Sequence, residues 1–182
     1  MSYSWELSPI HLAAFEGDID KLTKLFMDGN SINLQDRAGE TLLFSAVRSN
    51  QTETVQWLLE WGANPNIKTF NIEPYALKSY TPLHYAAEEN YVECVKILLD
   101  YDADIEAPEQ NGQTPLLLAL DTSNAWARIA APDAAKLLIA RGANVNATFM
   151  DKSTLFWARA SNHREKSPDK DVIEMLINAG AK

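Results

Sequence analysis

The feature that most constrains the fold is a seven-residue pattern, clearest in residues 81–87 (TPLHYAA), that recurs along the chain. Thr81 can cap the start of a helix, and Pro82 suits the first helical position, where its missing N–H would have no partner. Leu83 is expected to point into a core. The two alanines that close the pattern favour a helix and let a neighbouring helix approach closely. The pattern therefore predicts a short helix that packs against other helices.

Four more copies begin at Ser8, Thr41, Thr114 and Thr154, so that successive starts are 33, 40, 33 and 40 residues apart. A second landmark follows each copy and usually contains a glycine, which can end a helix in the left-handed conformation. These landmarks lie at residues 28–30, 61–64, 101–104, 141–144 and 179–181. Five ordered pairs of landmarks indicate a protein built from repeats.

These residues make the chain resemble the ankyrin-repeat family along nearly its whole length. The resemblance implies an all-α solenoid of helix-turn-helix units joined by β-hairpin-like fingers, in a single domain over residues 1–182. Five repeats are expected to start near residues 4, 36, 76, 109 and 149, with the first and last acting as caps. In the third repeat Asp102 replaces the usual glycine, and we expect it to keep the left-handed turn.

One insertion lengthens the finger before the third repeat by seven residues, within residues 68–80. Its composition is apolar for a loop, since it contains Phe70, Ile72, Pro74, Tyr75, Leu77 and Tyr80. Insertions in repeat proteins map to loops on one face, often the binding face. Two interpretations remain open: the insertion binds a partner, or its aromatic residues cover neighbouring core.

A second insertion of seven residues falls between the two helices of the fourth repeat, around residues 124–130. Its alanines predict a lengthened inner helix, and Pro132 is expected to open the outer helix. Trp126 is a residue type enriched in interface hot spots. The alternative is that Trp126 packs on the next repeat.

The charge of the chain limits its partners. With 16 basic and 25 acidic residues the net charge is −9, which argues against nucleic-acid binding and against anionic membrane surfaces. No stretch approaches the length and apolarity of a membrane span. A single cysteine, Cys94, excludes an intramolecular disulfide. A soluble, cytoplasmic protein that is a monomer when free is therefore expected.

Few residues suggest catalysis. His11 and His84 occupy the fourth position of the repeat pattern, where the family resemblance implies hydrogen bonds that brace the helix start and the adjoining finger. His163 stands alone in a charged segment, and Cys94 is expected in the core. No zinc-site spacing, glycine-rich phosphate loop or nucleophile motif is present. We therefore expect no catalytic residues, no metal and no cofactor.

Binding is the remaining function, and the family resemblance places it on a concave face made by finger tips and the ends of inner helices. These positions include six acidic residues, which are Glu16 and five of the candidates listed below, and three basic residues, so a mildly acidic groove is predicted. The candidate partner-binding residues are Arg37, Glu40, Arg48, Tyr75, Leu77, Lys78, Tyr80, Glu88, Glu89, Gln110, Asn111, Gln113, Asp121, Trp126, Met150 and Asp151.

The predicted function is a non-catalytic module that holds a protein partner with a basic or mixed surface. A small inhibitor or immunity-type protein is one specific role, suggested by analogy alone. A structural adaptor or scaffold is the alternative, and an enzyme is the third possibility.

Overall fold

The computed structural model describes residues 8–70, 79–120, 131–160 and 170–182. Its helices in these ranges are α1 (Pro9–Glu16), α2 (Ile19–Met27), α3 (Leu42–Arg48), α4 (Thr52–Glu60), α5 (Pro82–Glu88), α6 (Val92–Asp100), α7 (Pro115–Leu120), α8 (Pro132–Ala140), α9 (Thr154–Ala160) and α10 (Lys170–Asn178). Two short strands, β1 (Thr148–Phe149) and β2 (Lys152–Ser153), form an antiparallel hairpin.

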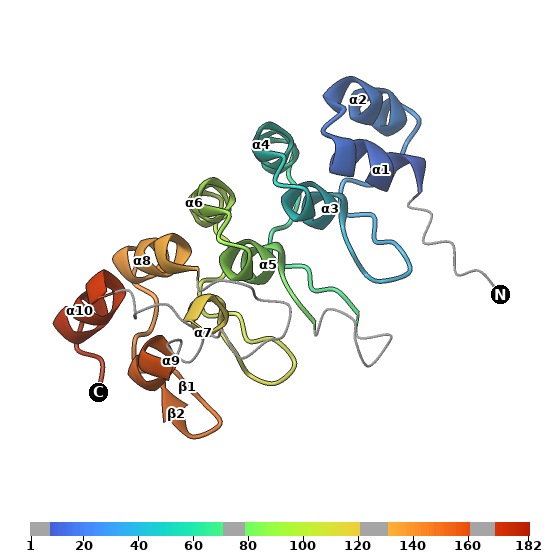
Figure 1. Ribbon diagram of the computed structural model, residues 1–182. Coiled ribbons are helices and arrows are strands. Elements are labelled where there is room, and N and C mark those ends of the chain that lie inside the picture. Colours follow the sequence, from blue (N-terminus) through green and yellow to red (C-terminus); the bar gives the residue numbers. More distant parts are fainter. Residues whose placement is uncertain (1–7, 71–78, 121–130, 161–169) are drawn as a thin grey trace.

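The helices stack as antiparallel pairs in two rows (Figure 1). The inner row is α1, α3, α5, α7 and α9, and the outer row is α2, α4, α6, α8 and α10. The loops that join one pair to the next project from the inner row, on the side away from the outer helices (Figure 1). The described part of the chain is thus the all-α solenoid that the sequence predicts, with α1 and α10 at opposite ends.

Local signals set the helix ends. The Oγ1 atom of Thr41 accepts a hydrogen bond from the Phe44 N–H at 3.1 Å, which caps α3. Proline opens α1, α5, α7 and α8, as expected for the first helical position. After the outer helix of the third repeat, Asp102 has a φ of 60°, so the left-handed turn survives without glycine. The predictions for Asp102 and for the start of α8 at Pro132 are confirmed.

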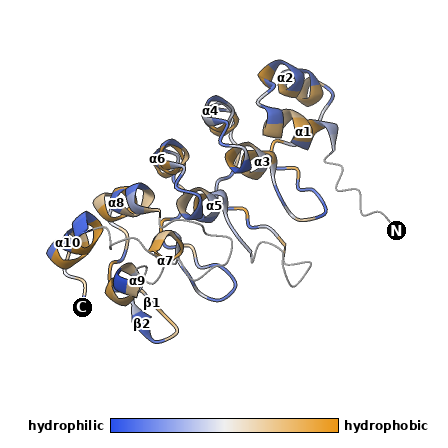
Figure 2. Ribbon diagram, viewed as in Figure 1, coloured by the Kyte–Doolittle hydropathy of each residue, from blue (hydrophilic) through white to orange (hydrophobic). Residues whose placement is uncertain are grey.

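The core lies between the two rows and continues along the stack. Leu43, Leu83 and Leu116 occupy the same position of the repeat pattern and are almost completely buried. Hydrophobic residues lie mainly on the helices, and α7 is the most uniformly hydrophobic of them (Figure 2). Each helix pair therefore buries its apolar face against the next pair, as expected of a quasi-one-dimensional repeat protein.

A ladder of side-chain hydrogen bonds ties the loops of adjacent repeats together. Asn33 Oδ1 accepts the Asn64 N–H at 2.8 Å, and Asn66 Oδ1 accepts the Asp104 N–H at 2.8 Å. In the next two repeats, Glu106 accepts from Asn144 at 2.7 Å and Asn146 accepts from Lys182 at 3.2 Å. The four bonds repeat with the period of the fold and satisfy backbone donors that are otherwise left to water.

The fingers are held by their first residue. Asp36 Oδ1 accepts from the backbone N–H groups of Ala38 and Glu40, at 2.8 and 2.9 Å. Glu109 Oε1 does the same for Asn111 and Gln113. In the fifth repeat the β1–β2 hairpin turns at Met150 and Asp151, which both have positive φ angles of 49° and 56°.

The ends of the 68–80 insertion pack on the rest of the protein. Phe70 donates its N–H to the Ala38 carbonyl of the preceding finger at 2.8 Å, and Lys68 Nζ donates to the Pro108 carbonyl of the following finger at 2.7 Å. Tyr80 is buried. Tyr80 therefore follows the core-covering interpretation, whereas the Phe70 side chain remains 51% exposed. The centre of this insertion and all of the 124–130 insertion, with the inner-helix extension expected there, lie outside the described residues.

The concave face and its buried supports

The structure places part of the predicted site on one face, called here the concave face: the loop tips and the exposed ends of the inner helices. The exposed tip residues are Arg37, Gln110, Asn111, Met150 and Asp151. The partly or fully exposed helix-end residues are Arg48, Glu88 and Glu89. Five candidates lie outside the described residues, namely Tyr75, Leu77, Lys78, Asp121 and Trp126.

Three candidates are buried, which corrects the expectation that they lie on a binding surface. Glu40, Tyr80 and Gln113 are 4%, 6% and 5% exposed. Each directly precedes the first residue of a repeat pattern, where the finger returns to the inner helix. Tyr80 packs with Phe44 and Leu118 and stacks on the His84 ring, with 5.4 Å between ring centroids. A partner cannot reach these side chains without moving the finger.

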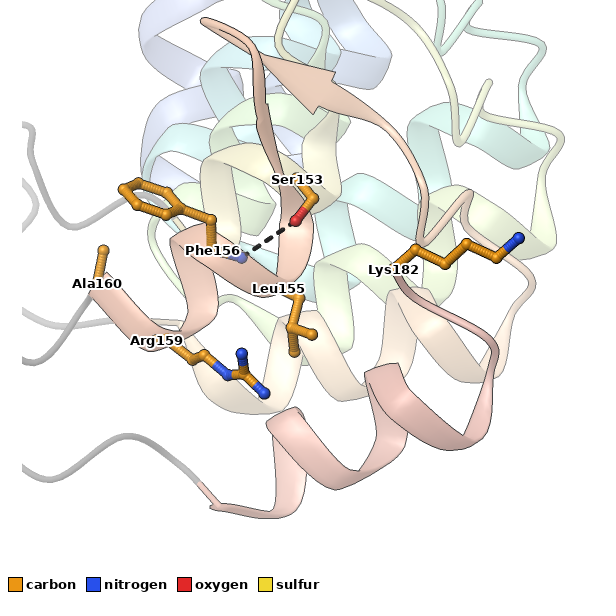
Figure 3. Close-up of a pocket in the computed structure, with 6 residues that line it drawn as sticks. All are labelled: Ser153, Leu155, Phe156, Arg159, Ala160 and Lys182. Carbon is orange, nitrogen blue, oxygen red and sulfur yellow. Dashed lines mark hydrogen bonds between the residues drawn. The ribbon is translucent and has the colours of Figure 1, made fainter.

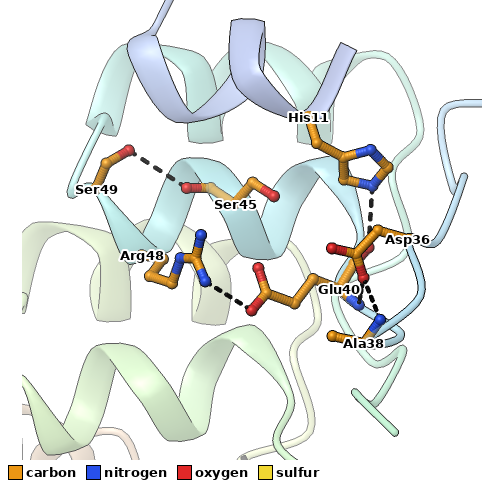
Figure 4. A network of polar contacts seen from close by, with 7 residues as sticks. All are labelled: His11, Asp36, Ala38, Glu40, Ser45, Arg48 and Ser49. Atoms are coloured by element: carbon orange, nitrogen blue, oxygen red, sulfur yellow. Dashed lines mark hydrogen bonds and ion pairs between the residues drawn. The ribbon is translucent and has the colours of Figure 1, made fainter. Parts of the chain in front are cut away.

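Glu40 belongs to a polar network under the first two repeats (Figure 4). Its Oε1 atom accepts from Arg48 Nη1 at 2.9 Å, and its backbone carbonyl accepts from His11 Nε2 at 3.0 Å. The Arg48 guanidinium also lies over the Phe15 ring, 5.4 Å from its centroid. Burial raises the pKa of Glu40, the Arg48 charge opposes this, and Asp36 adds to it.

The ion pair between Glu40 and Arg48 lowers the number of unpaired charges on the concave face. Because Glu40 and Arg48 form an ion pair, neither contributes a free charge to a partner. Among the other described candidates, Glu89 and Asp151 are exposed acids, Glu88 is a partly exposed acid, and Arg37 is an exposed base. The described part of the concave face is therefore acidic chiefly at the end of α5.

A tyrosine pair at this position was missed by the sequence reasoning. Tyr85 is half-buried on α5, makes an edge contact with Phe44 at 5.6 Å between centroids, and has Tyr91 at 6.4 Å. Burial raises the pKa of Tyr85 to about 12, and Glu89 adds to the effect. Burial and Glu89 also raise the pKa of Tyr91. The sequence does carry a signal for Tyr85, because this tyrosine occupies the position of the repeat pattern at which the second repeat has Ser45.

His11 braces both the helix start and the finger, as the resemblance implied, and His84 braces the helix start. His11 accepts at Nδ1 from the Ser8 hydroxyl at 2.7 Å and donates at Nε2 to the Glu40 carbonyl. His84 Nδ1 accepts from the Thr81 N–H at 3.1 Å and lies 2.8 Å from the Thr81 hydroxyl oxygen. Burial lowers the pKa of His84 to about 4, and the Gln113 and Ala107 carbonyls oppose the shift. Its Nε2 atom is buried without a hydrogen bond of good geometry.

Cys94 lies in the core of α6, as predicted, with its thiol donating to Asn50 Oδ1 at 3.3 Å. Burial raises the pKa of this thiol to about 12, and Glu93 adds to the effect, so the nucleophilic thiolate is disfavoured. Within the described ranges, no three His, Cys, Asp or Glu side chains are grouped as a metal site requires.

A pocket of about 390 Å³ lies at the end of the stack rather than on the concave face (Figure 3). Phe156, which is 45% exposed there, occupies the position that is buried as Leu43, Leu83 or Leu116 in the preceding repeats. Lys152 Nζ lies 5.1 Å from the centroid of the Phe156 ring. The pocket lining consists of Ser153, Leu155, Phe156, Arg159, Ala160 and Lys182.

The described helices are all too short or too polar to cross a lipid bilayer.

Comparison with known proteins gives several relatives. The chain is 34% identical over 174 residues to the human transient receptor potential cation channel subfamily A member 1, covering 94% of this chain and 14% of that protein. It is 29% identical over 185 residues to the ANK repeat-containing protein nipk-1 of Caenorhabditis elegans, covering 96% and 24%. Human ankyrin repeat and SOCS box protein 6 is 34% identical over 134 residues, covering 72% and 30%. The chain thus spans less than a third of each of these relatives.

The family model for ankyrin repeats in three copies matches residues 2–69 and again residues 70–148. These two matches extend over most of the chain and agree with the stacked helix pairs, the finger loops and the histidine braces. The chain belongs to the ankyrin-repeat family.

Proposed function

We propose that this chain is a non-catalytic module that binds a basic segment of a protein partner on its concave face, with the end of α5 as the central contact. Ankyrin repeats are in general protein-interaction modules. The observation that carries the specific proposal is the tyrosine pair, Tyr85 and Tyr91, beside the carboxylates Glu88 and Glu89.

This cluster has the chemistry to recognise lysine or arginine. Tyrosine rings bind cations over their faces, and the nearby carboxylates add direct charge. Tyr85 is partly buried against Phe44, so its ring is already ordered before a partner arrives. Ordered aromatic side chains lose little conformational freedom on binding, which favours affinity.

The neighbouring repeats support a rigid binding surface. Arg48 is fixed by Glu40 and by the Phe15 ring on one side of the cluster. On the other side, Glu109 holds the finger that carries Gln110 and Asn111 at its tip. Interfaces of this kind combine a central aromatic anchor with a polar rim.

The test uses a photo-reactive amino acid in place of Glu89, which should crosslink the partner in cells and identify it by mass spectrometry. Affinity for that partner is then measured with the purified chain. Glu88→Lys with Glu89→Lys should weaken binding at least about tenfold and reduce its salt dependence, because two carboxylates at the contact are reversed.

The control carries the same change of charge on outer helices. Asp133→Lys with Glu174→Lys alters exposed carboxylates on α8 and α10 and should leave the affinity almost unchanged. If both double variants weaken binding equally, net charge rather than the concave face determines affinity, and the proposal is wrong.

Two biological roles fit a module of this kind. An inhibitor or immunity-type protein needs only the concave face, because neutralising a basic partner requires one surface. An adaptor needs a second, separate surface. The number of independent binding surfaces therefore distinguishes the two roles.

A further inference from the structure

We propose that the outer helices carry a second docking surface, which receives a basic, amphipathic segment of a protein partner. The surface is the aromatic patch of α2 and α4, defined by Phe26, Met27, Trp57 and Trp61. It lies on the outer row, whereas the concave face lies on the inner row and its loops (Figure 1).

The patch is continuous across two repeats. Trp57 lies in α4, and Trp61 is the residue directly after this helix, four positions further along; their ring centroids are 4.9 Å apart. Phe26 of α2 stacks on Trp57 with a centroid distance of 5.8 Å and an interplanar angle of 29°. Trp61 remains 52% exposed and Met27 78% exposed. The patch therefore offers large apolar side chains to solvent.

The fold does not require a tryptophan at position 61. This position precedes the left-handed residue that ends each outer helix, and the other repeats have Asp28, Tyr101, Arg141 and Ala179 there. Acidic, aromatic, basic and small residues all complete the same turn. Trp61 therefore adds exposed aromatic surface that the turn itself does not need, and tryptophan is enriched in interface hot spots.

The charged residues around the aromatic patch favour a basic occupant. Over residues 18–28, 52–62 and 92–102, which form α2, α4, α6 and their ends, there are eight carboxylates and three lysines. Lys96 is paired with Glu93 at 3.0 Å, and the carboxylate of Asp100 is paired with Arg141 at 2.7 Å. A segment with lysine or arginine on one side and apolar residues on the other would satisfy both the carboxylates and the patch, with cations over the tryptophan faces.

The same charge disfavours two other occupants. An anionic membrane surface would be repelled by the acidic rim, although tryptophan and methionine are compatible with lipid. A second copy of this chain would bring two surfaces of the same sign together, and each copy carries a net charge of −9. A basic partner segment is the occupant that the rim attracts.

A second surface would let the chain hold two partners at once, which favours the adaptor role. This inference does not rest on the concave face. A negative result for one surface does not affect the proposal for the other, because the variants that test the two surfaces lie on different rows of helices.

The experiment measures binding of a fluorescent leucine–lysine peptide of about four helical turns to the full chain by fluorescence anisotropy. Trp61→Ala should raise the Kd at least about tenfold. Asp28→Asn with Glu60→Gln should also weaken binding and flatten its dependence on salt. The same peptide with glutamate in place of lysine should not bind.

Ile177→Ala is the matched control, since Ile177 is 49% exposed near the end of another outer helix, α10, and its replacement should leave binding unchanged. Circular dichroism checks that each variant is folded. The proposal is overturned if the wild-type chain does not bind the lysine peptide, or if Trp61→Ala binds as the wild type does. Loss of binding in Glu89→Lys but not in Trp61→Ala would assign the peptide to the concave face instead.

Self-association and lipid binding are checked with the same proteins. A dimer of the wild-type chain that dissociates in Trp61→Ala would identify a second copy as the occupant and overturn the proposal. If the wild-type chain binds anionic phospholipid vesicles and Trp61→Ala does not, the occupant is a membrane surface and the proposal is also overturned.

Discussion

Arg48 Nη1 lies 2.9 Å from Glu40 Oε1, and the pair joins the end of α3 to the base of the preceding finger. Only 6% of the Glu40 side chain is exposed, so the carboxylate depends on Arg48 for compensation of its charge. We predict that Arg48→Ala lowers the free energy of unfolding by roughly 2 kcal/mol at pH 7. Urea denaturation measures the change.

Two further measurements separate the charge from the packing of Arg48 on Phe15. Glu40→Gln in the Arg48→Ala background should recover part of the loss, since no buried charge remains. The penalty should also shrink at low pH, because the pKa of Glu40 is raised by burial and rises further without Arg48. A loss that is independent of pH would show that lost packing, rather than the buried charge, dominates.

Gly39 should tolerate no side chain. Its φ is 75°, and a Cβ atom would lie 2.5 Å from the Phe70 backbone nitrogen. We predict that Gly39→Ala destabilises the protein by more than about 2 kcal/mol, since backbone strain and a clash act together. Gly62→Ala is the control: its φ is 89°, but nothing lies within 4 Å of the added atom. Gly62→Ala should lower the melting temperature less, and equal effects would contradict the packing of Phe70 on Gly39.

Asp102 is held in a left-handed conformation that favours glycine. Asp102→Gly is expected to raise the free energy of unfolding by up to about 1 kcal/mol, because it relieves the strain at a φ of 60°. The converse change, Gly142→Asp, places the same strain at the equivalent turn of the fourth repeat and should destabilise the protein. Thermal unfolding compares the two, and a destabilising Asp102→Gly would mean that the aspartate contributes interactions of its own.

Protonation of His84 should make the protein less stable as the pH is lowered. Its folded-state pKa is about 4, below the ordinary histidine pKa of 6.5, so the unfolded chain takes up the proton first. The free energy of unfolding should therefore decrease as the pH falls from 6.5 to 4, by roughly 3 kcal/mol in full.

The matching variant is His84→Gln. It should be less stable at pH 7, because the bracing of the Thr81 helix start is altered, but it should show a shallower fall in this pH range. An unchanged slope would assign the pH dependence to another group. Acid titrations followed by circular dichroism provide the comparison.

The repeat signals made most of the fold predictable. α5 begins at Pro82 and α8 begins at Pro132, as the sequence predicts, because helix starts depend on neighbouring residues. The left-handed Asp102 and the buried Cys94 followed from their positions in the repeat. Prediction of the candidate site was less complete, since exposure is decided by contacts between repeats.

Sequence alone determined the number of repeats, their register and the acidic balance, because each depends on local spacing or composition. The bracing role of His11 and His84 was implied by the family resemblance instead. Tertiary structure decided which surface side chains remain available. Glu40, Tyr80 and Gln113 are buried, Tyr85 is half-buried and Trp61 is exposed, as a result of packing between residues about 30 to 40 positions apart. Those contacts depend on how one repeat is rotated on the next, which the pattern within a single repeat does not specify.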